Sequence, residues 1–176
     1  MHNKVNPIRK NLIEKWRLFI SLFLMLSVLS ACGFKLRGDY LLAPELQTLY
    51  VSSVDTHGEL TRLVKRHLTI NQVTVVNSLT RNIPELRILK DQLNRRTLSV
   101  FPNGQVAEYE LIYSVNYQLR LVDQDATTYN FEMYRNYQDD PDIALAKSRE
   151  LSLLLSEMRS AAADRILRNM ASIKIE

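Results

Sequence analysis

A run of fifteen residues with period two constrains this chain more than any other feature. From residue 107 to residue 121 every odd position carries an apolar side chain or tyrosine, and the even positions are polar except Ile112. Such alternation is typical of a strand with one buried face and one face in contact with water or a polar partner. The odd positions are Ala107, Tyr109, Leu111, Tyr113, Val115, Tyr117, Leu119 and Leu121.

The flanking sequence extends this strand into a meander. Asn103-Gly104 precedes it, and Asn-Gly is a strong hairpin signal because both residues tolerate positive φ. A polar turn over residues 122–126 leads into a third strand, so the region from Leu86 to Tyr137 is expected to form three long antiparallel strands. Two further short strands are expected over residues 49–53 and 73–76.

Two amphipathic helices complete the expected fold. Thr56 and Glu59 match a capping box, and the helical spacing that follows predicts a helix to about Ile70. Asp140 and Pro141 suit the start of a second helix of about thirty residues, ~45 Å long. The fold class is therefore α+β: a two-layer sandwich with two helices on one face of a mostly antiparallel sheet. The apolar stripe of the second helix is Leu151, Leu154, Leu155, Met158, Ala162, Ile166 and Met170.

The N-terminus has the pattern of a bacterial lipoprotein signal. A basic stretch precedes an apolar run over residues 18–31, and Leu29-Ser30-Ala31-Cys32 is the ending at which such signals are cleaved and the cysteine is lipidated. We expect residues 1–31 to be a cleaved signal peptide, residues 32–46 a lipidated tether and residues 47–176 one α+β domain. Several acyl chains on Cys32 would hold the domain at a membrane, and Gly33 in place of the aspartate of inner-membrane retention favours the outer membrane. The alternative is an uncleaved membrane helix followed by a buried free cysteine.

Removal of the signal changes the charge of the chain. The whole sequence has 23 basic and 19 acidic side chains, and the signal holds five and one of them, so the remainder has 23 − 5 = 18 and 19 − 1 = 18. The formal charge of the expected mature chain is zero, which argues against nucleic-acid binding by a basic surface. The chain's one cysteine also excludes an intrachain disulfide.

Motifs for catalysis are missing from the sequence. His57 and His67 have no neighbouring metal ligands at a known spacing, so surface or boundary positions are favoured over a metal site. Asp139, Asp140 and Asp142 suit the positive end of a helix better than a calcium loop. We therefore expect no enzyme activity, metal or cofactor.

The sequence nevertheless resembles a known family. Residues 32–38 (Cys-Gly-Phe-Lys-Leu-Arg-Gly), 99–105 (Ser-Val-Phe-Pro-Asn-Gly-Gln), 107–109 (Ala-Glu-Tyr) and 144–147 (Ala-Leu-Ala-Lys) together are similar to the lipopolysaccharide-assembly lipoprotein family LptE. The resemblance implies an outer-membrane lipoprotein on the periplasmic side. It would plug the lumen of the β-barrel LptD, help that barrel assemble and contact lipopolysaccharide during transport to the cell surface. Pro102 stands where some members carry a basic residue.

Two sets of residues are candidates for these contacts. The polar side of the long strand could face the barrel, although water is the alternative; its residues are Ser114, Asn116, Gln118 and Arg120. Basic residues could meet lipopolysaccharide phosphates, although a solvated surface is again the alternative; they are Lys147, Arg87, Lys90, Arg95 and Arg96. A lipoprotein with the same anchor and sandwich could also serve another envelope machine, as a secretin pilot or a transporter subunit.

Overall fold

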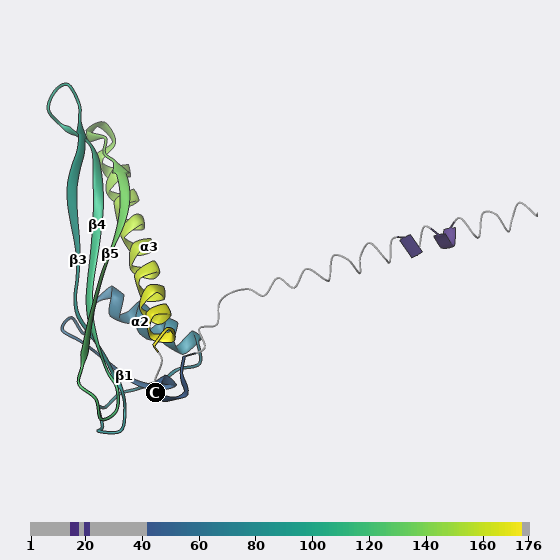
Figure 1. Ribbon diagram of the computed structural model, residues 1–176. Helices are drawn as coiled ribbons and strands as arrows, with labels where there is room; N and C mark the ends of the chain where they lie inside the picture. Colours follow the sequence, from purple (N-terminus) through teal and green to yellow (C-terminus); the bar gives the residue numbers. More distant parts are fainter. Residues whose placement is uncertain (1–14, 18–19, 22–41, 174–176) are drawn as a thin grey trace, which may run out of the picture. The chain divides into compact units, whose positions relative to one another are not determined.

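The computed structural model describes residues 15–17, 20–21 and 42–173, and the fold reported below is that of residues 42–173 (Figure 1). The expected signal peptide and the lipidation site Cys32 lie outside the described residues, apart from two short helical pieces of the signal. The elements in chain order are η1 (Pro44–Leu46), β1 (Thr48–Ser53), α2 (Glu59–Ile70), β2 (Thr74–Val76), β3 (Glu85–Val100), β4 (Val106–Arg120), β5 (Thr127–Gln138), η2 (Pro141–Ile143) and α3 (Ala144–Ala171).

One five-stranded sheet forms the first layer, in the order β2-β1-β3-β4-β5. Strand β1 pairs in parallel with both β2 and β3, while β3, β4 and β5 form the expected antiparallel meander. Since β4 is fifteen residues long, at ~3.4 Å per residue the meander extends for about 50 Å. The predicted α+β fold class is confirmed.

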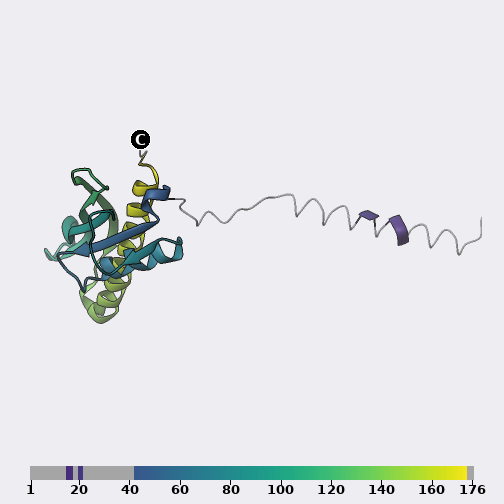
Figure 2. The ribbon, with the colours of Figure 1, turned by 90° about the horizontal axis from the view of Figure 1, so that it is seen from below.

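The two helices form the second layer. Figures 1 and 2 show α2 and α3 on the same side of the sheet. Helix α3 runs along the meander, and α2 lies beside the C-terminal part of α3. Side chains from both helices and from the sheet share one hydrophobic core. Leu42 and Leu46, in the stretch expected to be an irregular tether, are buried in that core.

The alternating faces of β4 are as the sequence predicts. Leu111, Tyr113, Val115, Tyr117 and Leu119 are buried against the helices, whereas the residues between them are only partly buried. The opposite side of the sheet carries none of the helices of residues 42–173 and is called the open face below. This arrangement places the polar side chains of β4 on the open face.

Strand β3 contains an irregularity that the sequence does not reveal. Its register with β4 shifts between Ile88, opposite Tyr117, and Lys90, opposite Asn116, so Leu89 is the extra residue of a β-bulge. Before this bulge the even positions face the helices, and from Asp91 to Thr97 the odd positions do; the register shifts again on both sides of Ser99. Asp91 therefore points toward the helices, although the pattern of Leu86 and Ile88 alone would place it on the open face.

One local prediction was wrong, and another was confirmed with a particular turn geometry. Thr56 is not the helix cap: α2 begins at Glu59 after Gly58, and no side chain caps it. The predicted hairpin joins β3 to β4, and in it the amide of Phe101 donates to Gln105 O and the amide of Gly104 to Phe101 O. Gly104 alone has positive φ there, +84°, so the loop is a tight turn over Pro102-Asn103 closed by a left-handed glycine.

Candidate interaction surface

The open face is a continuous polar surface across three strands. Ser114 Oγ donates to Glu132 Oε1 at 3.0 Å, and Gln118 Nε2 donates to Thr128 Oγ1 at 3.1 Å, which links β4 to β5. Tyr134 OH also donates to Glu132, to Oε2 at 2.6 Å. The bonds from Tyr134 and Ser114 stabilise the carboxylate and lower the pKa of Glu132. The face is thus held by side-chain hydrogen bonds between neighbouring strands.

The structure brings the four predicted barrel-contact residues together. Ser114, Asn116, Gln118 and Arg120 follow one another along the open side of β4 and are all partly buried. Arg120 also contacts the start of β3, because its Nε lies 3.7 Å from Glu85 Oε2 and its Nη2 donates to Ile83 O at 3.4 Å. These four residues form one row, and two of them, Ser114 and Asn116, line a hollow of about 660 Å³ together with residues of β5.

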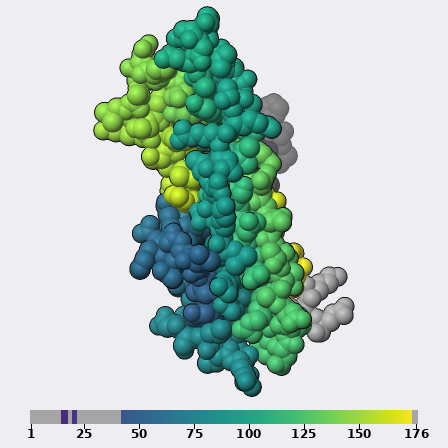
Figure 3. Space-filling model, turned by 90° about the vertical axis from the view of Figure 1, so that its left-hand side faces the viewer, coloured from purple at the N-terminus to yellow at the C-terminus, as the bar shows by residue number. Residues whose placement is uncertain are grey.

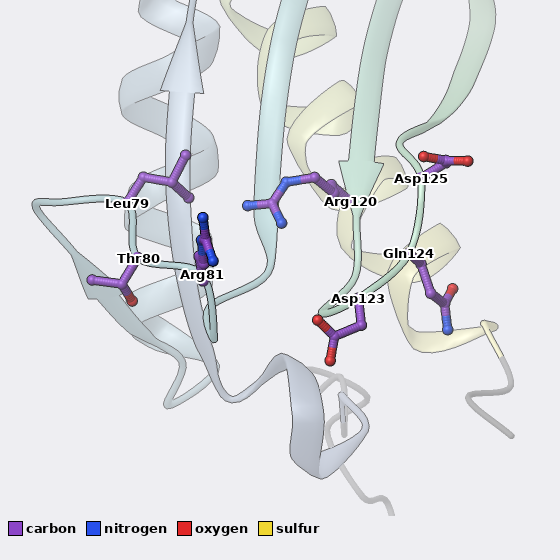
Figure 4. A pocket seen from close by; sticks show the side chains of 7 residues that line it. All are labelled: Leu79, Thr80, Arg81, Arg120, Asp123, Gln124 and Asp125. Carbon is purple, nitrogen blue, oxygen red and sulfur yellow. The ribbon is translucent and has the colours of Figure 1, made fainter.

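A hollow of about 540 Å³ lies at the Arg120 end of this row (Figure 4). Two arginines and two aspartates line it, so neither sign of charge dominates. It is open to solvent and shaped by loops on either side of the sheet end. Its lining residues are Leu79, Thr80, Arg81, Arg120, Asp123, Gln124 and Asp125.

The predicted basic residues of β3 do not form one cluster. Arg87 and Lys90 lie opposite Gln118 and Asn116 of β4, which places them on the open face. Arg96 is on the same face but is paired, with its Nη2 2.6 Å from Glu110 Oε2. Arg95 lies opposite Leu111 on the helix side, where its guanidinium is 5.8 Å from the ring centre of Tyr109.

Lys147 lies away from the open face, on the first turns of α3. Its side chain is only 15% exposed, and its Nζ donates to Glu150 Oε2 at 2.9 Å. The ammonium group also lies 5.2 Å from the ring centre of Tyr137. The hydrogen bond to Glu150 stabilises the charged form and raises the pKa of Lys147. The positive charge of Lys147 is therefore balanced by Glu150 within the fold, and Lys147 does not lie beside Arg87 and Lys90.

A polar network between the layers was not found from the sequence. Arg159 of α3 places its Nη1 2.5 Å from Glu59 Oε2 of α2 and its Nε 3.8 Å from Asp91 Oδ2 of β3. Asp91 in turn accepts a hydrogen bond of 2.6 Å from Tyr113 OH. This network joins α2, α3, β3 and β4 at the middle of the sheet. The sequence pattern does not indicate this network, because the bulge before Asp91 breaks the period of β3.

The histidines and acidic residues lie outside any metal cluster in the part of the chain that the structure describes. His67 is bonded instead, with its Nδ1 2.7 Å from Asp164 Oδ1, and this contact joins α2 to α3. Asp140 accepts from the amide of Asp142 at the start of η2, as predicted for a cap, and α3 follows directly. Among the described helices, none is long and apolar enough to cross a membrane.

The fold and this surface define a class of protein: small α+β domains that present one long polar sheet face. Comparison with known proteins identifies the family. The family model for lipopolysaccharide assembly, LptE, matches residues 46–170, and the chain therefore belongs to the LptE family.

Individual relatives agree with this assignment. The LPS-assembly lipoprotein LptE of Pectobacterium atrosepticum is 38% identical over 160 residues, covering 89% of this chain and 86% of that protein. The protein of the same name from Yersinia enterocolitica is 37% identical over 154 residues, covering 87% and 74%. The crystal structure of rare lipoprotein B from Shewanella oneidensis is 50% identical with a TM-score of 0.66, covering 71% of this chain and 94% of that chain.

Proposed function

We propose that this chain is an outer-membrane lipoprotein, anchored through Cys32, that occupies the lumen of the barrel LptD and helps it assemble. Its relatives are named LPS-assembly lipoproteins, which supports a role in lipopolysaccharide assembly for this chain as well. The proposed role is one of binding: the domain contacts the barrel wall and lipopolysaccharide, and it carries out no reaction.

The long open face is the observation that carries this proposal. The lumen of a wide outer-membrane barrel is polar, and its apolar outer band is about 25 Å tall. A meander of about 50 Å is long enough to run through such a barrel, and its open face offers hydroxyls, amides and paired charges. A buried apolar side and a hydrogen-bonded polar side are what a plug of this kind requires.

The barrel contact can be tested with Asn116→Arg, at the centre of the row on β4. Asn116 lies opposite Lys90 and Asn130, so the new cation adds bulk to the open face and one like-charge neighbour, which costs at most about 1 kcal/mol. We expect the variant to fold and to recover less of the barrel in co-purification from mild detergent. Thr69→Arg, on the exposed surface of α2, is the matched control and should recover the barrel as the native chain does.

Two results would contradict the proposal. Full recovery of the barrel with Asn116→Arg would mean that this part of the open face meets water. An unfolded Asn116→Arg domain, with a melting temperature reduced as for loss of a core residue, would mean that the faces have been assigned wrongly.

For lipopolysaccharide, the proposal places the phosphate contact at Arg87 and Lys90. Both are exposed on the open face, and neither has an ion-pair partner within the described residues. Arg96 and Lys147 are each paired with a glutamate, and Arg95 faces the helix layer. Of the five basic candidates, Arg87 and Lys90 are the two that can meet an anion on the open face without first breaking an ion pair.

A further inference from the structure

The outer edge of β5 is a second surface of the sheet and is distinct from the open face. β5 is the last strand in the sheet order, so no strand pairs with its outer side. It runs for twelve residues, Thr127–Gln138, without proline, and its register with β4 contains no bulge. In Figure 3, which looks onto β3, the green surface of β5 forms one border of the molecule.

The register shows which backbone groups of β5 point outward. The amide of Asp139 donates to Ala107 O, and Tyr137, Arg135 and Met133 lie opposite Tyr109, Leu111 and Tyr113. In an antiparallel pair this makes the odd residues of β5 the hydrogen-bonded ones, so the even residues direct N–H and C=O away from β4. The outward residues are Thr128, Asn130, Glu132, Tyr134, Asn136 and Gln138.

Within the described part of the chain, one hydrogen bond reaches the outward backbone groups of this row. Arg165 of α3 donates from Nη1 to the carbonyl of Glu132 at 3.1 Å, while its guanidinium lies 4.5 Å from the ring centre of Phe131. Of the twelve β5 residues, Phe131 and Tyr137 are buried and the other ten are exposed or half-exposed, and every outward residue is exposed.

Sheet edges of this length are normally protected. Proteins shorten an edge strand, place proline or a bulge in it, or cover it, because unpaired N–H and C=O groups bind any extended chain. The opposite edge of this sheet follows the rule, since β2 has only three residues. The edge of β5 is neither short nor interrupted, and among the described residues its protections are the contact of Arg165 and the charge of Arg135 on the helix side.

We propose that the edge of β5 receives an extended segment of a partner polypeptide as a sixth strand. The outward N–H and C=O groups of β5, one pair at every second residue, can form hydrogen bonds with an extended backbone. A strand of a closed barrel wall cannot supply it, because both of its sides are already paired. The segment is therefore a loop or a terminus, which extends the proposed barrel contact to a different part of the partner.

Charge specifies one side of the guest strand. Arg135, opposite Leu111, lies on the helix side of β5, as does Arg165, and Arg135 has no ion-pair partner among the described residues. Acidic side chains of the guest on this side would face the side of β5 that carries these two guanidinium groups. A second copy of the chain, pairing β5 with β5, would instead bring these arginines toward each other. An acidic segment of another protein is thus the favoured occupant.

The test uses the whole chain in mild detergent and a nine-residue probe peptide. Every second residue of the peptide is threonine, and the residues between are valine and glutamate in turn. The control peptide carries lysine in place of each glutamate. Hydrogen exchange of single β5 amides, followed by NMR, reports strand addition. With the glutamate peptide, exchange at Asn130, Tyr134 and Asn136 should slow at least tenfold, and the lysine peptide should bind at least fivefold more weakly in low salt.

Two variants separate backbone pairing from charge. Asn136→Pro removes one outward N–H and leaves the bonds to β4 in place, so it should weaken binding of the glutamate peptide several-fold. Arg135→Glu keeps the backbone and should reverse the preference between the two peptides, which provides a result even if the proline variant does not fold.

Three outcomes would overturn the proposal. They are unchanged exchange at the outward amides with saturating peptide, equal binding of the two peptides by the native chain, and tighter binding of both peptides by Arg165→Ala. The last outcome would show that Arg165 only shields the edge. Since each readout uses the chain alone with a peptide, failure of the barrel proposal would not affect it.

Discussion

Tyr113 combines burial with a polar contact in the centre of the fold. Its side chain is 1% exposed, and its hydroxyl donates to Asp91, which also lies near Arg159. Burial, followed by the hydrogen bond to Asp91, raises the pKa of Tyr113 far above its usual value. Folding therefore favours the protonated hydroxyl near pH ~10, where a free tyrosine side chain begins to ionise.

This shift predicts an alkaline loss of stability. Because the folded pKa is raised, the contribution of Tyr113 is complete below pH ~10 and decreases above it, by up to about 1.4 kcal/mol per pH unit, as the unfolded chain ionises. Tyr113→Phe should lose about 1–3 kcal/mol at pH 7, because Asp91 loses its donor, and should fall less steeply than the native chain above pH 10. Urea unfolding between pH 7 and 11.5 measures both effects. A constant difference between the two proteins over that range would contradict the prediction.

At this scale the sequence predicts one side of the contact only. The period of β4 places Tyr113 on the helix side, and the structure agrees. The position of Asp91 could not be predicted, because a bulge leaves no mark in the polarity of the residues around it. Glu59 and Arg159, which are 100 residues apart, could not be paired from spacing either.

Helix α3 is unevenly buried along its length. Met158, Ala162, Ile166 and Met170 of the predicted stripe are buried, whereas Leu151, Leu154 and Leu155 are only partly so. The C-terminal half packs on both the sheet and α2, and the N-terminal half extends beyond α2 along the sheet (Figure 1). Leu167, which the stripe omitted, is fully buried, while Leu153 is 60% exposed.

The same substitution should therefore have different effects at the two ends of α3. Leu167→Ala leaves a cavity between the layers and should reduce the free energy of unfolding by about 2–5 kcal/mol. Leu153→Ala, its matched control on the same helix, should change it by no more than ~0.5 kcal/mol. Thermal or urea unfolding of both variants is the measurement, and similar losses would show that the N-terminal half of α3 is packed as closely as the rest.

Elements with a strong period were predicted well, and their ends were not. The meander, the two helices and the two short strands are all present. The capping box failed because Thr56 lies inside a turn in which the amide of Gly58 donates to Asp55 O, so the chain enters α2 only at Glu59. The path that a loop must take between two packed elements decides where the helix begins, even where a short-range sequence signal favours another residue.

At the scale of the whole domain, the basic residues are divided between the two layers. Arg87 and Lys90 lie on the open face, Arg95 faces the helices, and Lys147 lies on α3 beside Glu150. A linear sequence cannot show this division, because it depends on the bulge in β3 and on the contact between α3 and Tyr137. The available positive charge is therefore smaller and more localised than the basic run suggests.

Binding of lipopolysaccharide should depend on Arg87 and Lys90 more than on Lys147. Each exposed contact contributes about 0.2–1 kcal/mol, so the double variant Arg87→Gln, Lys90→Gln should bind a few-fold more weakly in low salt, and the difference should shrink at high salt. Lys147→Gln is the control and should bind as the native chain does. Vesicle or micelle titration with purified lipopolysaccharide provides the affinities. A larger loss with Lys147→Gln would place the contact on α3.

The extra residue in β3 has a consequence for how the length of this strand can vary. Leu89 has no partner on β4, and the residues on either side of it face the same layers as they would in a strand without it. A chain lacking this one residue would keep Ile88 and Asp91 on the helix side and lose only a local bend. In comparisons among family members, a single-residue gap is expected here, and an alignment that forces the two halves of β3 together without it would assign the wrong layer to half of the strand.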